Sequence, residues 1–127
     1  MDKRIDADAV AATVEDGATI VLCGSGGGLI EADFVYAAIE RRFLTTGHPR
    51  DLTLVHALGI GDGKEKGLNR FAHEGMVRRV IGGHWSWSPR MQAMAEADLI
   101  EAFVLPAGCV ALLNREIGAG RPGLITH

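Results

Sequence analysis

Four short apolar runs, each followed by glycine and separated by segments of helical periodicity, constrain the fold of this chain most strongly. The runs begin near Ile20, Leu52, Val77 and Leu99. Strands that alternate with helices in this way build β-α-β units whose strands lie parallel. The second run has few polar positions, so we expect both of its faces to be covered. The pattern predicts an α/β domain with an open, mostly parallel sheet flanked by helices.

Helix signals stand between the apolar runs. The segment from Glu31 to Thr45 repeats apolar residues at i, i+4 and i+8, which is typical of an amphipathic helix. Ser88 followed by Pro89 predicts the start of another helix, because serine is a good N-cap and proline suits the first helical position. We also expect a helix over residues 110–117 and a fifth strand beginning in Gly123-Leu124-Ile125-Thr126.

Length and charge narrow the class of protein. A chain of 127 residues with 47% hydrophobic and 23% charged residues is typical of one globular domain, so residues 1–127 are expected to form a single α/β domain. The net charge of −3 favours neither nucleic acid nor an anionic membrane as a partner. No apolar run approaches the roughly 18 residues of a membrane span, and Cys23 and Cys109 form no paired motif. We therefore expect a cytoplasmic protein with reduced thiols.

Glycine is about twice as frequent as average, with 17 of 127 residues. Ten of these glycines follow a predicted strand, and the carboxyl ends of parallel strands form the ligand crevice of open α/β sheets. Glycine there lets backbone N–H groups approach a ligand, although βα turns also favour glycine for purely structural reasons. The ten are Gly24, Gly26, Gly27, Gly28, Gly59, Gly61, Gly63, Gly82, Gly83 and Gly108.

Familiar glycine motifs do not fit these loops. A dinucleotide fingerprint needs glycine where Leu29 stands, and a phosphate-binding loop needs Ser or Thr where Glu65 follows Lys64. Ser25 is not a hydrolase nucleophile elbow, because Cys23 replaces the first glycine of that motif. The five histidines lack close ligand spacing, which argues against a metal site.

A histidine and two tryptophans follow the third predicted strand. His84, Trp85 and Trp87 either wall a pocket, fill a subunit interface or pack in the core. We take His84 and Trp85, together with Gly61 and Asp62 from the preceding loop, as the candidate pocket wall.

Ordered strings along the whole chain carry a family resemblance. They are Asp16-Gly17-Ala18-Thr19, Gly26-Gly27-Gly28 with Glu31-Ala32, Gly47-His48-Pro49-Arg50-Asp51-Leu52-Thr53, Gly61-Asp62, Gly67-Leu68, His73-Glu74-Gly75, Gly82-Gly83-His84-Trp85, Ser88-Pro89-Arg90, Leu105-Pro106 and Gly120-Arg121-Pro122-Gly123. This series resembles the family I CoA-transferases, specifically the single-chain acyl-CoA:acetate/3-ketoacid type of short-chain fatty acid and ketone body metabolism. The resemblance implies a CoA-transferase-like fold and makes this chain the amino-terminal part of the family's first half, a truncated half.

The resemblance also implies a reaction. In the family, a glutamate attacks an acyl-CoA thioester, forms an anhydride and then a glutamyl-CoA thioester, and passes CoA to a carboxylate such as acetate or a 3-keto acid. That glutamate belongs to the second half, and none of Glu31, Glu74 and Glu101 matches its motif. We therefore expect no catalytic residue in this chain, no permanently bound cofactor, and CoA as substrate. The implied partners are a complementary second half or β subunit and further copies in a homo-oligomer.

Two loops are implied to face the acyl site. One is the glycine-rich loop Gly24, Ser25, Gly26, Gly27 and Gly28. The other is Pro106, Ala107 and Gly108, which matches a family Pro-Gln-Gly turn whose glutamine lies near the reacting carbonyl. Backbone donors in both loops suit an oxyanion formed during thioester attack. This sequence departs from the family at Ala107, which replaces the glutamine, and at Cys23-Gly24-Ser25, where Gly-Gly-Phe is commoner.

Two other interpretations remain open. A non-catalytic module that binds CoA or acyl-CoA, or that serves assembly, would keep the fold and lose chemistry, as Ala107 suggests. Another reaction on the same scaffold, such as sugar-phosphate isomerisation or CoA-ester hydrolysis, would use converging charged groups. Asp62, Lys64 and Glu65 are candidates for such groups, but the sequence favours a solvated charged loop as their explanation.

Overall fold

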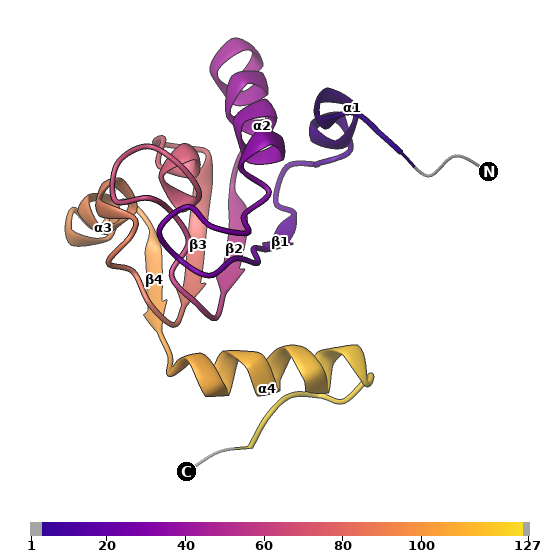
Figure 1. Cartoon of the computed structure of the whole chain (residues 1–127), viewed down its shortest axis with the longest axis vertical. Coiled ribbons are helices and arrows are strands. Elements are labelled where there is room, and N and C mark those ends of the chain that lie inside the picture. The colour runs from indigo at the N-terminus through magenta and orange to yellow at the C-terminus, as the bar shows by residue number, and fades with distance from the viewer. Residues whose placement is uncertain (1–3, 126–127) are drawn as a thin grey trace.

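The sheet has four parallel strands in the order β1-β2-β3-β4 in the computed structural model, which describes residues 4–125 (Figure 1). The strands are β1 (Thr19–Val21), β2 (Leu52–His56), β3 (Val77–Gly82) and β4 (Glu101–Val104). Because spatial order equals chain order, each connection moves one strand along the sheet. The predicted open, parallel α/β architecture is confirmed, with strands slightly shorter than the apolar runs.

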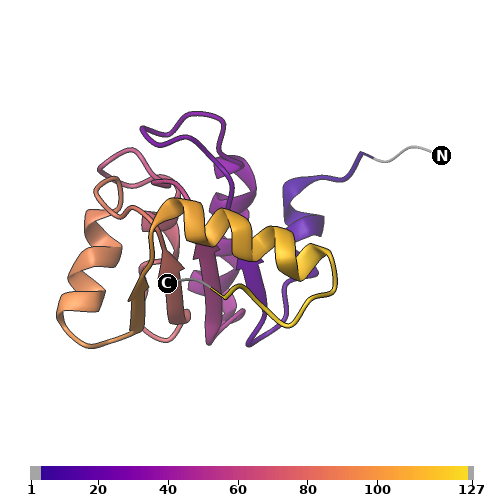
Figure 2. The ribbon, with the colours of Figure 1, turned by 90° about the horizontal axis from the view of Figure 1, so that it is seen from below.

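Helices flank this sheet. They are α1 (Ala7–Ala12), α2 (Asp33–Thr46), the 3-10 helix η1 (Leu68–Phe71), α3 (Pro89–Glu96) and α4 (Ala107–Gly118). Figure 1 shows α4 crossing beyond the carboxyl ends of the strands, below their arrowheads, and Figure 2, seen from below, shows it in front of them. Among the residues described, no helix is long and apolar enough to cross a membrane.

The main core lies between the sheet and the helices α1, α2 and α3. Leu54 of β2 pairs with Ile20 and Val80, and all three side chains belong to the core or pack against it. Every residue of β2 is buried, as its apolar run predicts. The opposite face is thinly covered, because Val110 is the one buried residue of α4. One side of the domain is therefore closed, and the other keeps apolar surface exposed.

The helix ends follow the local sequence signals. Gly47 ends α2 in a left-handed conformation with φ 74°, and its N–H donates to the Phe43 carbonyl at 2.7 Å. Pro89 is the first residue of α3 and Ser88 precedes it, as predicted. The Ser88 hydroxyl does not cap the helix, however, because it donates to the Trp85 carbonyl instead.

Two element predictions differ from the structure. The helix predicted from Glu31 begins two residues later, at Asp33. The predicted fifth strand is wrong over residues 123–125, which form no strand, while Thr126 lies outside the described residues. Ile125 is 93% exposed, and an isolated segment without a neighbouring strand cannot satisfy the backbone bonding that defines a sheet.

Truncating the central strand should show how much the core stabilises the domain. We expect Leu54→Ala to lower the free energy of unfolding by about 2–5 kcal/mol, because Leu54 is fully buried and its removal leaves a cavity. Urea unfolding followed by circular dichroism measures this loss. Leu44→Ala, at a 62% exposed position on α2, is the matched control and should change the free energy by about 0.5 kcal/mol or less. Equal losses in the two variants would contradict this account of the core.

Candidate functional site

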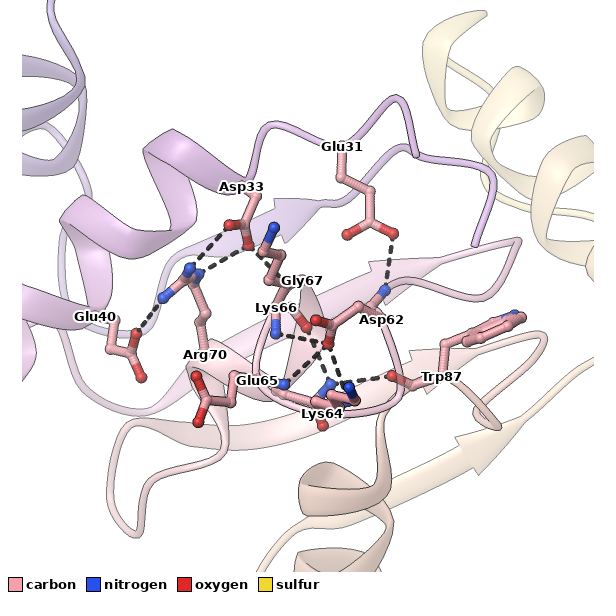
Figure 3. Close-up of polar contacts among 12 residues, drawn as sticks. Glu31, Asp33, Glu40, Asp62, Lys64, Glu65, Lys66, Gly67, Arg70 and Trp87 are labelled. Carbon is pink, nitrogen blue, oxygen red and sulfur yellow. Dashed lines mark hydrogen bonds and ion pairs between the residues drawn. The ribbon is translucent and has the colours of Figure 1, made fainter. Parts of the chain in front are cut away.

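The loops that follow β1, β2 and β3 meet around one peptide unit, that of Gly61. The Gly61 carbonyl accepts a hydrogen bond from the Gly28 N–H at 2.7 Å. The Gly61 N–H donates to Glu31 Oε1 at 2.8 Å (Figure 3). Only glycine suits this position, since its φ is 133° and a Cβ would lie 2.3 Å from the Trp87 carbonyl oxygen. Glycines predicted to share one edge of the sheet therefore do lie together.

The glycine-rich loop leaves donor groups available at this edge. Gly26, Gly27 and Gly28 all have positive φ values of 79°, 64° and 77°. The Ser25 N–H donates to the Leu29 carbonyl, and the Gly28 N–H is used by Gly61. Within residues 4–125, the N–H groups of Gly26 and Gly27 make no hydrogen bond. Gly27 is exposed whereas Gly26 is buried, so the Gly27 amide is the donor of this loop that a ligand oxygen can reach.

An ion-pair network fixes the second loop, residues 61–67, to α2. The Arg70 guanidinium binds both carboxylate oxygens of Asp33, at 2.8 and 2.9 Å, and donates to Glu40 at 3.0 Å (Figure 3). Asp33 Oδ1 also accepts the Gly67 N–H at 2.9 Å. The Arg70 guanidinium holds the pKa of Asp33 below its ordinary value. His73 completes the network through a 2.8 Å contact with Glu40.

Asp62 shapes its own loop. Its Oδ1 accepts the N–H groups of Lys64, Glu65 and Lys66 at 2.9, 2.9 and 3.0 Å. Desolvation raises the pKa of Asp62, but the backbone donors outweigh it and hold the value below the ordinary range. Lys64 and Glu65 are exposed to solvent. Their exposure agrees with the interpretation of this segment as a solvated charged loop.

Glu31 is the functional-site candidate that sequence reasoning did not single out. A Cβ on Gly24 would lie 2.5 Å from its Cγ, and a Cβ on Gly67 would lie 2.5 Å from its Oε2. Oε2 is inaccessible and has no hydrogen-bond partner within the described residues. Desolvation chiefly raises the pKa of Glu31, although the Gly61 N–H opposes the shift. The sequence signal for this position is the pair of glycines that makes room for it.

The four predicted wall residues separate into two places. Gly61 and Asp62 belong to the loop junction, whereas His84 and Trp85 line a cavity of about 380 Å³ beside β4. Trp85 also packs edge-on against His56, with ring centroids 5.8 Å apart. His56 is fully buried, its Nδ1 lies 2.8 Å from the Leu58 carbonyl, and desolvation lowers its pKa.

The sequence left open whether Trp85 and Trp87 line a pocket, fill a subunit interface or pack in the core. In the structure, Trp87 lies beside the loops at the strand ends. Its indole borders Gly26 and Gly59, where a Cβ would lie 2.8 and 2.6 Å from ring atoms. One tryptophan of the pair therefore packs on the core histidine, and the other borders the loops at the strand ends.

The second predicted donor loop stands apart from the first. Pro106, Ala107 and Gly108 begin α4, and the Pro106 carbonyl accepts the N–H of Cys109 at 2.8 Å. This turn lies close to the loop after β3, since a Cβ on Gly83 would lie 3.0 Å from Ala107 Cα. No hydrogen bond within residues 4–125 joins this turn to the loop at 24–28.

No metal centre is present among the residues described. No group of three or more His, Cys, Asp or Glu side chains is arranged to hold an ion.

Replacing the Glu31 carboxylate should change how stability depends on pH. A raised pKa means that folded Glu31 binds its proton more readily than unfolded Glu31, so its contribution is full below the ordinary pKa and is lost as pH rises through the raised value. Glu31→Gln keeps an acceptor for the Gly61 N–H and removes this loss. We expect the free energy of unfolding of Glu31→Gln to rise relative to that of the wild type as pH rises above the ordinary carboxyl pKa, measured by urea titration at each pH. Glu65→Gln, in the exposed loop, is the control, and parallel curves for wild type and Glu31→Gln would contradict the argument.

Comparison with known proteins gives these loops a context. No family model matches the chain. The chain is 34% identical over 113 residues to the acetate CoA-transferase YdiF of Escherichia coli (strain K12), covering 89% of this chain and 21% of that protein. It is 37% identical over 127 residues to the caffeate CoA-transferase of Acetobacterium woodii, covering 99% and 24%.

The fold agrees with the sequence comparison. A crystal structure of the acyl-CoA transferase YdiF from E. coli O157:H7, as a thioester complex with CoA, superposes with a TM-score of 0.91 and 32% identity, covering 94% of this chain and 25% of that one. The chain thus spans about a quarter or less of the length of the proteins it matches. The chain is therefore similar, in both sequence and fold, to one segment of proteins named CoA-transferases.

Proposed function

We propose that this chain is the amino-terminal part of the first half of a CoA-transferase, and that the complete site moves CoA between a short acyl-CoA and a carboxylic acid such as acetate or a 3-keto acid. The similarity to proteins named acetate and caffeate CoA-transferases, at 34% and 37% identity, carries this proposal. The reaction proceeds through a glutamyl-CoA intermediate whose glutamate lies outside these 127 residues.

The chemistry gives this segment a defined task. Attack of the glutamate carboxylate on the thioester carbonyl forms a bond to carbon and puts negative charge on the carbonyl oxygen. Collapse expels CoA thiolate and leaves an anhydride, and the thiolate then attacks the glutamyl carbonyl and releases the first carboxylic acid. A second carboxylate takes CoA by the reverse steps. The unbonded and exposed amide of Gly27 is suited to stabilise the oxygen during such steps, because a donor that is already in place needs no reorganisation.

A complementary second half, or a β subunit, is the partner that this proposal requires. Apolar surface on β4 and α4 supports it, since Val104, Leu112 and Ile117 are 71%, 47% and 60% exposed. We assign the protein to the cytoplasm and to a homo-oligomer on the same reasoning from resemblance, with CoA as a substrate and no permanently bound cofactor. The free thiols of Cys23 and Cys109 fit a reducing compartment.

A non-catalytic CoA-binding or assembly module is the second candidate. The observation that favours it is Ala107, which stands where the family's glutamine side chain approaches the reacting carbonyl. The two candidates share the fold and differ only in whether CoA is transferred.

Complementation with the missing half separates the candidates. We expect this chain, mixed with the complementary part of an acetate CoA-transferase, to convert butyryl-CoA and acetate into acetyl-CoA and butyrate, measured by chromatography. The complementary part alone and a mixture with a Gly61→Val chain are the controls, because a side chain at Gly61 collides with the Trp87 carbonyl. No exchange with a correctly folded complex would refute the transferase proposal, and binding without exchange would favour the module.

Restoring the family's glutamine should raise the rate. We expect Ala107→Gln to increase transfer by on the order of tenfold or more, since one oxyanion donor is commonly worth at least that much. Steady-state rates of the complemented enzyme measure the gain. Ala119→Gln, at the exposed carboxyl end of α4, is the matched control and should leave the rate unchanged. An unchanged rate in Ala107→Gln would show that this turn does not reach the reacting carbonyl.

A further inference from the structure

Trp87 combines a fixed backbone with an exposed ring. Its carbonyl oxygen accepts the Gly63 N–H at 2.9 Å (Figure 3). It also accepts the Asn69 side-chain amide at 3.0 Å. Asn69 is fully buried and also donates to the Lys66 carbonyl, so its side chain is held in place. The main chain at Trp87 is therefore held by the loop that follows β2, which fixes the position of the Trp87 backbone from which the ring extends.

The indole ring extends from this anchor away from the charged network, as Figure 3 shows. Its edge borders Gly26 and Gly59, and further ring atoms would lie 3.9 and 3.8 Å from a Cβ on Gly27 and Gly63. Glycine at 26 and 59 leaves the space that the ring fills, since a Cβ there would lie 2.8 and 2.6 Å from the indole. The ring is thus supported by two loops on its inner side.

The outer side of the ring is open. Trp87 is 42% exposed, and its indole N–H makes no hydrogen bond within residues 4–125. A large aromatic surface that is rigidly supported and left uncovered is the kind of surface on which an apolar group packs. The unbonded amides of Gly26 and Gly27 belong to the same loop that borders this ring.

We propose that Trp87 is a specificity-determining residue that contacts the acyl chain of the thioester substrate. This inference rests on the proposed function. An acyl carbonyl oxygen bound by the exposed Gly27 amide would lie in the loop that borders the indole, which brings the acyl carbons within reach of the exposed ring. Acetyl is too short to use the ring, whereas a chain of four carbons covers part of it. Trp87 therefore favours acyl groups longer than acetyl.

Trp85 serves as the internal contrast for this assignment. It packs against His56 and the core and lies against none of the glycines at 26, 27, 59 or 63. The two tryptophans, two positions apart in the chain, thus have separate tasks, and only Trp87 faces the proposed acyl position.

Acyl-chain preference in the complemented enzyme tests the proposal. We expect Trp87→Ala to lower the ratio of kcat/KM for butyryl-CoA to that for acetyl-CoA by about tenfold, because one or two methylene contacts are worth roughly this much. Trp87→Phe should restore part of the ratio. Leu44→Ala, another exposed apolar truncation, should leave it unchanged. A structural role for Trp87 would lower both kcat/KM values together, so an unchanged or increased ratio overturns the proposal while the transferase function stands.

Fluorescence of the 127-residue chain provides a second measurement that needs no turnover. Trp85→Phe leaves Trp87 as the only tryptophan. We expect butyryl-CoA to change its emission at concentrations where CoA alone does not, since only the ester carries an acyl chain. Equal responses to CoA and butyryl-CoA overturn the acyl contact. If the complemented wild type shows no transfer, the proposed function fails, and this titration then decides whether Trp87 meets an acyl thioester.

Discussion

The Gly61 peptide is the point on which the arrangement of the site depends. Its carbonyl is held by the Gly28 N–H and its own N–H by the Glu31 carboxylate, so the first two loops are joined through one residue. The Trp87 carbonyl fills the space where a side chain would be, which adds the third loop. A larger residue would collide with the backbone of that loop rather than with a flexible side chain. Three strand ends are therefore held at fixed separation by a residue that contributes no side chain.

The charged residues around this junction stabilise loop geometry more than they supply chemistry. Arg70 binds Asp33 through two hydrogen bonds and reaches Glu40 with its remaining nitrogen, with all three side chains less than a quarter exposed. Bidentate pairs of this kind fix orientation as well as distance. Because the network joins α2 to the second loop, the position of Gly61 is fixed relative to that helix. Donors held in this way are already oriented when charge develops, which is the condition for electrostatic stabilisation.

Much of the fold follows from the sequence because apolar runs and glycine breaks are local signals. The four strands, the burial of β2 and the end of α2 at Gly47 were all predictable on that basis. The start of α2 was not, because Leu29 and Ile30 continue the loop outward, with Ile30 at φ 55° and 88% exposed against its usual preference. The fifth strand failed because an apolar segment forms a strand only beside a partner, and periodicity does not show whether one is present.

The candidate site could also be predicted only in part from the sequence. Spacing was enough to place the glycines at one edge, since the carboxyl ends of parallel strands must meet there. It was not enough to distinguish Trp85 from Trp87, because side-chain direction in an irregular loop follows no period. Glu31 was missed for a related reason: its burial depends on glycines 7 residues before it and 36 after it in the chain, which only the folded loops bring together.

The separation of the two donor sets has a chemical consequence. The Gly26 and Gly27 amides lie in a loop held by Gly61, whereas Ala107 begins a helix that crosses beyond the carboxyl ends of the strands and lies close to the loop after β3. A single carbonyl oxygen must lie within about 3 Å of every donor that stabilises it. Since α4 has only one buried residue, its position on the sheet is weakly held by the described part of the chain. Under the proposed function, contacts from a second half would bring the turn at 106–108 to the same substrate atom, and assembly of the halves and completion of the oxyanion site would then be one event.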